Sequence, residues 1–304
     1  MAPDAGEGQG RRALITGLSG FTSAYLAQEL RRAGYRVFGS VMPGAEMGAD
    51  CVQADLTDRA AVARMVEQVR PDVVAHLAAI AFVAHADAEQ FYRVNIVGTR
   101  NLLEALAAQP HKSSAVLLAS SANVYGNASA GVIDEDVAPA PANDYAVSKL
   151  AMEYVARLWS DRLPIVIARP FNYTGVGQGG HFLLPKIVDH FRRRARMIEL
   201  GNLDVARDFS DVRSVVACYR RLLAACPAGQ IMNVCSGQGH TLASVLDSMS
   251  AMAGYQIEVR VNPALVRSNE VQVLVGSNAK LRGAIGPVAH IALADTLRWM
   301  YQAH

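Results

Sequence analysis

Three side chains in the middle of the chain have the types and spacing to move a proton: Ser121, Tyr145 and Lys149. Tyr145 and Lys149 stand four residues apart, so on a helix they share one face. A phenol has an unperturbed pKa of about 10, and a nearby cation lowers that pKa toward neutral pH. Ser121 can orient a carbonyl or alcohol oxygen beside the phenol. The three residues therefore predict proton transfer at such an oxygen while hydride moves to or from its carbon.

A glycine turn near the N-terminus supports this interpretation over the simpler one, a surface helix whose lysine reaches solvent. An apolar run over residues 12–16 breaks into Gly17-Leu18-Ser19-Gly20 and then enters a helical pattern with Leu26 and Leu30. A strand, a tight glycine turn and a helix N-terminus form a cradle for a pyrophosphate, because free backbone N–H groups and the helix dipole favour an anion. The turn predicts a dinucleotide site.

The strands and helices that must position these residues alternate along the chain. Buried strands are predicted at Ala13–Thr16, Arg36–Val41, Val73–His76, Ala115–Ala119 and Ile165–Ala168. Helices are predicted at Ala24–Ala33, Ala60–Val69, Ala88–Ala107, Tyr145–Trp159, Pro185–Arg196 and Val215–Ala225. This alternation predicts an α/β fold with a parallel sheet and helices on both faces.

The chain resembles the extended short-chain dehydrogenase/reductases, in the branch that modifies nucleotide sugars. The motifs that carry the resemblance span nearly the whole chain: Thr16-Gly17-Leu18-Ser19-Gly20-Phe21, Ala54-Asp55-Leu56, His76-Leu77-Ala78-Ala79, Asn95-Ile96-Val97-Gly98-Thr99, Arg169-Pro170-Phe171-Asn172, Arg207-Asp208-Phe209-Ser210-Asp211-Val212 and Asn233-Val234-Cys235-Ser236-Gly237. The last three look most like the GDP-4-keto-6-deoxy-D-mannose reductases, which make GDP-D-rhamnose.

The resemblance implies a Rossmann-type doubly wound sheet with a smaller C-terminal substrate-binding lobe. Residues 11–170 would form the dinucleotide-binding domain. Residues 171–304 would mainly form the substrate lobe, with a segment of about 205–235 returning to the Rossmann domain. Residues 1–10 are polar and glycine-rich, and we expect a disordered leader there.

The resemblance also assigns residues to the site. Ser121, Tyr145 and Lys149 would be catalytic. The cofactor would be bound by Gly17, Ser19, Gly20, Phe21, Thr22, Ser40, Asp55, Leu56, Leu77, Ala78, Ala79, Asn95, Tyr145, Lys149 and Pro170. The substrate would be contacted by Ser121, Asn123, Asn172, His181, Arg207 and Arg267. The two arginines suit a diphosphate because guanidinium groups bind phosphate oxygens bidentately. His181 is either a second acid or a loop histidine that contacts substrate or solvent.

The end of the second strand favours NADP(H) over NAD(H). That strand ends at Ser40-Val41-Met42, with no acid to bind a ribose 2′-hydroxyl and no arginine to bind a 2′-phosphate. The missing acid removes the main repulsion against the 2′-phosphate of NADP. Asp55 is the alternative acid for NAD, but its place after the next strand fits the adenine better.

The residue type at position 123 distinguishes the dehydratases of this branch from its other enzymes. Relatives that dehydrate a sugar carry a carboxylic acid two residues after the catalytic hydroxyl, and an amide cannot act as a general acid. The favoured function is therefore NAD(P)H-dependent reduction of the 4-keto group of a nucleotide-linked 4-keto-6-deoxy sugar, with GDP-4-keto-6-deoxy-D-mannose preferred. Two alternatives stay open: an NAD-dependent nucleotide-sugar 4-epimerase, and a non-catalytic NADP-sensing regulator on the same fold.

Composition agrees with a cytoplasmic enzyme. The chain has 304 residues, of which 51% are hydrophobic and 18% charged, and a net charge of +2 that suggests no nucleic-acid partner. No apolar run is long enough to cross a membrane. Four cysteines without Cys-x-x-Cys spacing suggest reduced structural thiols and no metal site. The resemblance implies a homodimer, formed through the helices around residues 88–107 and 145–159.

Overall fold

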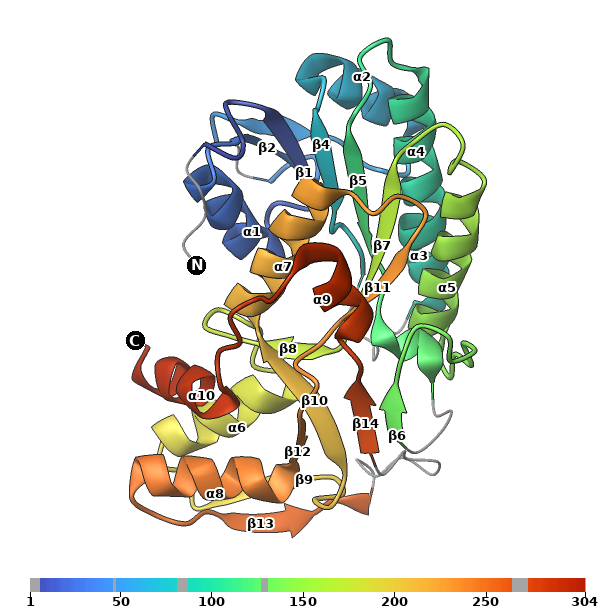
Figure 1. The fold of residues 1–304 in the computed structure, drawn as a ribbon. Coiled ribbons are helices and arrows are strands. Elements are labelled where there is room, and N and C mark those ends of the chain that lie inside the picture. Colours follow the sequence, from blue (N-terminus) through green and yellow to red (C-terminus); the bar gives the residue numbers. More distant parts are fainter. Residues whose placement is uncertain (1–5, 46–47, 81–86, 127–130, 264–272, 304) are drawn as a thin grey trace.

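The computed structural model describes residues 6–45, 48–80, 87–126, 131–263 and 273–303. A larger lobe contains a seven-stranded parallel sheet with helices on both faces, and a smaller lobe lies at the carboxyl ends of its strands (Figure 1). The predicted doubly wound α/β fold is confirmed. None of the helices in these ranges is long and apolar enough to span a lipid bilayer.

The large sheet has the strand order β11-β7-β5-β4-β1-β2-β3. Its strands are β1 (Arg12–Thr16), β2 (Arg36–Val41), β3 (Cys51–Gln53), β4 (Val73–His76), β5 (Ala115–Ala119), β7 (Ile165–Pro170) and β11 (Ile231–Val234). The five predicted strands are confirmed, although β1 begins one residue earlier and β7 runs two residues further to Pro170. The order reverses between β1 and β4, and ligands of such sheets bind outside the strand ends at this point.

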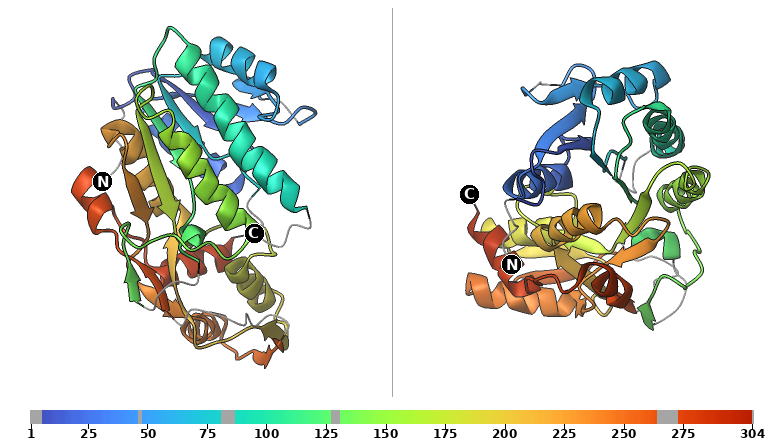
Figure 2. Two further views of the ribbon diagram at one scale, coloured as in Figure 1. Left: turned by 90° about the vertical axis from the view of Figure 1, so that its right-hand side faces the viewer. Right: turned by 45° about the horizontal axis from the view of Figure 1, so that its top comes forward.

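Alternate residues of β1 face two different helix layers. Ala13 and Ile15 pack in one hydrophobic cluster, while Leu14 packs in the other. The first layer contains α1 (Phe21–Arg32), α7 (Val212–Ala225) and α9 (Ala279–Ile285). The second layer contains α2 (Arg59–Val69), α4 (Thr99–Ala108) and α5 (Asp144–Arg157), with α3 (Ala88–Tyr92) at its end. Figure 2 shows the sheet between these layers.

One long predicted helix, Ala88–Ala107, is wrong as a single regular helix. It divides into α3, a π-helical turn η1 (Arg93–Gly98), and α4. Single π turns are wider than α turns and often occur at functional sites. Here the turn contains Asn95, whose side chain is buried. Gly98 closes it against the loop after β3, because an added Cβ would lie 3.1 Å from Leu56.

The smaller lobe is built mostly from the second half of the chain. Its strands are β6 (Gly131–Ile133), β8 (Asn172–Thr174), β9 (Met197–Leu200), β10 (Ala206–Asp211), β12 (Gly239–Thr241), β13 (Glu258–Val261) and β14 (Val273–Gly276). Its helices are α6 (Leu183–Arg192), α8 (Leu242–Ala253) and α10 (Leu293–Gln302). The predicted helix Pro185–Arg196 ends early, because Arg194 has a φ of 52° that a right-handed helix cannot continue.

Residues 6–10 of the leader that the sequence predicted to be disordered lie against the larger lobe, while residues 1–5 lie outside the described ranges. The N–H of Gly8 donates to the carbonyl of Ala33 (2.7 Å), and Glu7 forms an ion pair with the buried Arg220 of α7. Gly8 can lie this close because glycine has no side chain. A Cβ at this position would be 2.4 Å from the nitrogen of Tyr35. Sequence polarity alone did not reveal that the segment supplies a partner for a buried arginine.

Candidate active site

The turn after β1 has the geometry of a pyrophosphate cradle. Gly17 has a φ of +71°, and a Cβ there would lie 2.9 Å from the Cα of Ala78, so a side chain is excluded. Gly20 precedes α1 and forms no side-chain cap for it. The first N–H groups of a helix have no partner inside the helix. The turn therefore fits a dinucleotide cofactor, with Ser19 exposed at its tip.

Ser40 and Asp55 lie beside this turn but use their side chains within the protein. The buried Ser40 Oγ accepts from the N–H of Gly17 (3.1 Å), and its carbonyl accepts from Leu18 (2.9 Å). Asp55 Oδ1 accepts from the N–H and the hydroxyl of Thr57, each at 2.8 Å. Ser40 thus shapes the glycine turn, and Asp55 shapes the loop after β3 that carries the buried Leu56.

A hydrogen-bond chain through His76 ties the turn to the end of β4. The N–H of Ala78 donates to Thr16 Oγ1 (3.1 Å), which lies 2.7 Å from His76 Nδ1. On the other side His76 Nε2 lies 2.9 Å from Thr99 Oγ1, whose hydrogen is donated to the carbonyl of Asn95 (2.6 Å). Thr99 must therefore accept from Nε2–H, and Nδ1 accepts from Thr16. Burial, together with the charge of Lys149, lowers the pKa of His76 to about 3, so the ring is neutral.

Asn95 connects the segment after β4 to helix α5. Its amide nitrogen donates to Ser148 Oγ (2.9 Å), and Ser148 donates to the carbonyl of Tyr145 (2.8 Å). Its amide oxygen accepts from the N–H of Ile80, near Leu77, Ala78 and Ala79 after β4 (3.3 Å). Asn95, predicted to bind the cofactor, has both side-chain polar atoms in bonds within the protein.

The three predicted catalytic residues meet at the carboxyl end of β5. A hydrogen bond joins the Tyr145 phenol to the Ser121 hydroxyl. Ser121 Oγ also accepts from the N–H of Asn123 (3.1 Å) and caps the short helix η2 (Ala122–Tyr125). Lys149 donates to the carbonyl of Ala119 (2.7 Å). All three side chains are buried.

The pKa of Tyr145 is raised, whereas the sequence predicted that Lys149 would lower it. Burial raises this pKa well above its ordinary value, the bond with Ser121 lowers it, and Tyr173 raises it. The ammonium of Lys149 donates to Ala119, and burial lowers the Lys149 pKa to about 8 even though Glu153 opposes this shift. Desolvation thus sets the direction of the Tyr145 pKa. At neutral pH the phenol is protonated, which is the form that can donate a proton.

The residues predicted to contact substrate lie on the smaller lobe and its border. Asn172 and Arg207 are on the paired strands β8 and β10, where the Asn172 amide donates to the carbonyl of Asp208 (3.3 Å). His181 is exposed in the loop before α6, with its ring 4.4 Å from that of Phe182. The side chain of Asn123 is exposed beside Ser121. Arg267 lies outside the described residues.

Sequence reasoning missed two groups that support the site. Tyr173 on β8 lies 2.9 Å from Thr22 Oγ1 and stacks on Phe21, joining the glycine turn to the smaller lobe. Glu153 on α5 forms a buried ion pair with Arg169 of β7, the strand that ends at Pro170. The continued spacing of four residues from Tyr145 through Lys149 to Glu153 was the signal for the second group.

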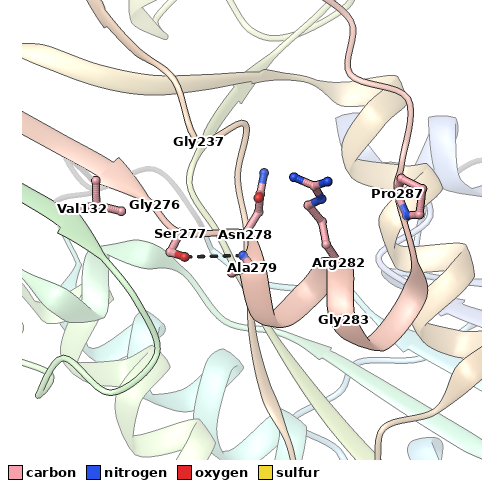
Figure 3. A pocket seen from close by; sticks show the side chains of 9 residues that line it. All are labelled: Val132, Gly237, Gly276, Ser277, Asn278, Ala279, Arg282, Gly283 and Pro287. Atoms are coloured by element: carbon pink, nitrogen blue, oxygen red, sulfur yellow. Dashed lines mark hydrogen bonds between the residues drawn. The ribbon is translucent and has the colours of Figure 1, made fainter.

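A surface hollow lies away from these residues, at the start of α9 (Figure 3). Arg282 and Asn278 point into it from the same helix end, across from Gly237. Of the predicted site residues that the structure describes, none lines this hollow. It is therefore separate from the glycine turn and the predicted catalytic residues.

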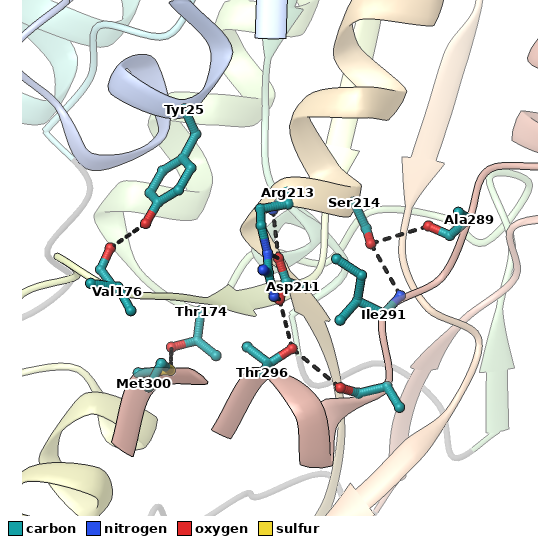
Figure 4. Close-up of polar contacts among 11 residues, drawn as sticks. Tyr25, Thr174, Val176, Asp211, Arg213, Ser214, Ala289, Ile291, Thr296 and Met300 are labelled. Atoms are coloured by element: carbon teal, nitrogen blue, oxygen red, sulfur yellow. Dashed lines mark hydrogen bonds and ion pairs between the residues drawn. The ribbon is translucent and has the colours of Figure 1, made fainter. Parts of the chain in front are cut away.

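The two lobes are fastened where α7 begins (Figure 4). Asp211 accepts from the N–H, Nε and Nη2 of Arg213 at 2.7–2.9 Å and from the hydroxyl of Thr296 on α10 (2.7 Å). The guanidinium of Arg213 lies 3.9 Å from the ring centre of Trp299. Tyr25 of α1 donates to the carbonyl of Val176 (2.7 Å). These contacts hold α10 and the loop after β8 against the larger lobe.

Comparisons with known proteins agree with the geometry. A family model described as GDP-mannose 4,6 dehydratase matches residues 14–300. A GDP-6-deoxy-D-talose 4-dehydrogenase of Aggregatibacter actinomycetemcomitans is 33% identical over 90% of each chain. A GDP-6-deoxy-D-mannose reductase of Pseudomonas aeruginosa is 33% identical over 95% of each chain.

Two solved structures give the same result. A Burkholderia cenocepacia protein with a provisional epimerase name is 55% identical, with a TM-score of 0.92 over 99% of this chain and 98% of that one. The RMD protein of Pseudomonas aeruginosa, solved with NADPH, is 32% identical, with a TM-score of 0.83 over 96% of this chain and 98% of that one. The chain belongs to the GDP-mannose 4,6-dehydratase family, within the extended short-chain dehydrogenase/reductases.

Proposed function

We propose that this protein reduces the 4-keto group of a nucleotide-linked 4-keto-6-deoxy sugar, with GDP-4-keto-6-deoxy-D-mannose as the favoured substrate. The product would be GDP-D-rhamnose or its C4 epimer. The observation that carries the proposal is the protonated, buried Tyr145 bonded to Ser121 beside the glycine turn. The names of the two relatives at 33% identity support a GDP-linked deoxy sugar.

The chain's own residues supply the proton and the orientation for this reduction. A reduced nicotinamide cofactor, with its pyrophosphate held at Gly17 and Gly20, would supply hydride. Tyr145 would donate its phenolic proton to the oxygen at C4, and Ser121 would hold that oxygen by a second hydrogen bond. The charged Lys149 would stabilise the phenolate that remains after proton donation. Burial of all three groups excludes water and strengthens these interactions.

Asn123 disfavours a dehydratase, although the matching family model is named for one. Its N–H donates to Ser121, and its exposed side chain is an amide. An amide cannot donate or accept a proton as the general acid or base that removal of water requires. A keto sugar that has already been dehydrated is therefore the substrate that these residues suit.

We favour NADP(H) as the cofactor over NAD(H). The end of β2 offers the buried Ser40 and no carboxylate, and Ser40 Oγ is bonded to Gly17. A 2′-phosphate would thus meet no negative charge from this strand. The Pseudomonas RMD protein was solved with NADPH, which supports the same preference.

The second candidate is an NAD-dependent nucleotide-sugar 4-epimerase, because the Burkholderia protein at 55% identity carries an epimerase name. An epimerase would use Ser121, Tyr145 and Lys149 in both directions and recycle its cofactor. Its purified form would contain tightly bound nucleotide. It would convert its substrate without added NADPH, which the reductase cannot do.

We also propose a cytoplasmic homodimer that forms through α5 and the turn before α4. Val97, Val147, Tyr154 and Leu158 are large apolar side chains exposed on these elements, with Leu158 80% accessible. A second copy of the chain would cover them, since such patches mark interfaces. Light scattering should then give twice the chain mass of 32.5 kDa, and Leu158→Glu should shift the protein toward monomer.

The deciding experiment follows NADPH absorbance with purified protein and GDP-4-keto-6-deoxy-D-mannose. NADH and the TDP- and UDP-linked 4-keto sugars run in parallel. Oxidation specific to the GDP sugar supports the proposal, and NMR of the product gives the configuration at C4. Tyr145→Phe should abolish turnover while NADPH binding is retained. Wild-type turnover in that variant would contradict the proposed proton donor, and no oxidation with any keto sugar would favour the epimerase.

A further inference from the structure

Glu153 lies at the centre of a buried polar cluster behind the catalytic residues. Its Oε1 accepts from Ser120 Oγ (2.5 Å) and Arg169 Nε (2.9 Å), and its Oε2 accepts from Arg169 Nη2 (2.6 Å). The Arg169 guanidinium also lies 4.8 Å from the ring centre of Tyr125. Glu153 and Arg169 are only 1% and 2% exposed. Burying two charges is expensive, so a pair here calls for a reason beyond packing.

The position of Glu153 on α5 gives that reason. Tyr145, Lys149 and Glu153 follow one another at intervals of four residues on one face of the helix. Each of them holds one of the three consecutive residues 119–121 at the end of β5. Lys149 holds the carbonyl at 119, Glu153 the hydroxyl at 120, and Tyr145 the hydroxyl at 121. Glu153 therefore fixes the residue directly before the catalytic serine.

Glu153 also supplies the negative charge that favours the ammonium form of Lys149. Burial lowers the pKa of Lys149, the Glu153 carboxylate opposes that shift, and the resulting value is about 8. The other titratable or charged groups around this site are neutral or positive at neutral pH: Tyr145 on α5, His76 on β4, Arg169 on β7, Tyr173 on β8 and Tyr219 on α7. Of the described groups around Lys149 that are named here, Glu153 is therefore the one that carries a negative charge.

We infer that Glu153 is a positioning residue for the proposed reduction: its carboxylate fixes the end of β5 against α5 and, one helical turn from Lys149, favours the ammonium form of that lysine. Arg169 and Ser120 hold the carboxylate in place, so that it stays ionised inside the protein. The inference rests on the proposed function for its kinetic consequences. The charge of Lys149 can be measured without any substrate.

The chain offers a simple measurement, because its sequence contains four lysines: Lys112, Lys149, Lys186 and Lys280. Protein labelled with ¹³C at the lysine Cε should give four sets of signals, and Lys149→Arg identifies the one that belongs to Lys149. A pH titration of that signal gives its midpoint directly. In the wild-type protein we expect a midpoint near 8, well below the ordinary value for lysine.

Glu153→Gln keeps the shape and removes the charge, and it should lower the Lys149 midpoint by about one pH unit. Glu153→Asp keeps the charge and should leave the midpoint closer to that of the wild type. The matched control is Glu29→Gln, which removes a carboxylate from the Arg220 ion pair between α1 and α7 and should not move the signal. An unchanged midpoint in folded Glu153→Gln overturns the inference. A wild-type midpoint above 10 overturns it as well, even if that variant does not fold.

Turnover provides the second measurement. If Lys149 must be charged, a midpoint lowered by one unit reduces the rate about eightfold at pH 8.5 but less than twofold at pH 6.5. A purely structural defect would reduce the rate equally at both pH values and would contradict the role in charge. If wild-type protein reduces no keto sugar, the proposed reaction fails, while the NMR midpoints still decide whether Glu153 keeps Lys149 charged.

Discussion

Two arginine–carboxylate pairs in this molecule have the same chemistry and opposite surroundings. At the end of the sheet that holds the proposed catalytic residues, Glu153 and Arg169 are both almost fully buried. Where the lobes meet, Asp211 is fully buried, but the side chain of Arg213 is 39% exposed (Figure 4). The first pair stands behind a buried lysine. The second caps α7 and anchors α10.

The difference in burial between the two pairs reflects two roles: the Glu153 pair supports the proposed chemistry, and the Asp211 pair supports the stability of the fold. Behind Tyr145 the fold buries a third charge, the ammonium of Lys149. The lowered pKa of this lysine shows that its charged form is less favourable inside the protein than in water. Around Asp211 each bond satisfies a group that would otherwise be unpaired, including the N–H of Arg213 at the start of α7. Substitutions should therefore have opposite effects on stability at the two places.

The largest effect is expected from Lys149→Met. Turnover should fall by about three orders of magnitude or more, because the charge beside Tyr145 is lost. Stability should nevertheless rise at pH 7. A pKa lowered from 10.5 to about 8 means that burying the ammonium costs about 3 kcal/mol, of which the lost bond to Ala119 offsets about 1. Urea unfolding at pH 7 should show a gain of about 2 kcal/mol.

The pH dependence of the same pair of proteins tests the cause. Between pH 8 and 10.5 the unfolded wild type binds a proton at Lys149 that the folded protein does not, so wild-type stability gains from this group as pH rises through that window. The methionine variant has no titrating group at this position, so its gain in stability over the wild type should shrink toward pH 10. An advantage that stays constant with pH would show that lysine burial is not its source.

Regular patterning predicted the larger lobe well, because a buried parallel strand is a short apolar run and its helices repeat with a period of 3.6. The five predicted strands are found within two residues of their predicted bounds. The π turn at Arg93–Gly98 was missed because one extra residue per turn hardly changes the apolar pattern. Strand β3 was missed because three residues are too few to show a period.

The sequence predicted the site residues that belong to recognisable motifs. It did not predict the contacts and pKa values that depend on how deeply a side chain is buried. Ser121 and Tyr145, 24 positions apart, are joined by a hydrogen bond. An acid such as Glu153 in mid-helix looks like a solvated side chain, and only the packing of α5 beside β7 brings it to Arg169. The sequence also could not weigh the desolvation of Tyr145 against the charge of Lys149, so the direction of its pKa was predicted wrongly.

A smaller effect of the opposite sign is expected at the junction from Asp211→Ala. The substitution removes the cap of α7, leaves the Thr296 hydroxyl with only its longer bond to the carbonyl of Ala292 (3.3 Å), and frees Arg213 over Trp299. Because Arg213 can still reach water, we expect a loss of about 3 kcal/mol, below the full cost of breaking a buried pair. Urea unfolding measures it.

Asp295→Asn is the matched control for the junction, since Asp295 pairs with Arg298 on the exposed side of the same helix α10. It should change stability by less than about 0.5 kcal/mol. An equal effect of the two variants would mean that the lobes are held by apolar packing alone. The contrast between the junction and the catalytic end would then disappear.

The smallest effect is expected at a third arginine, whose surroundings lie between those of the other two. Arg220 is 7% exposed and is shared by Glu29 of α1 and Glu7 of the N-terminal segment. Glu7→Gln removes one charge of the two and keeps an acceptor, so the arginine remains paired and the cost should be about 1 kcal/mol. Asp50→Asn is the control, because its 3.9 Å pair with Arg36 is exposed and should contribute almost nothing. If both variants unfold at the same urea concentration as the wild type, residues 6–10 add no stability to the larger lobe. A loss of stability in Glu7→Gln alone would show that the ion pair of the N-terminal segment stabilises the fold, as the Asp211–Arg213 pair at the junction is expected to do.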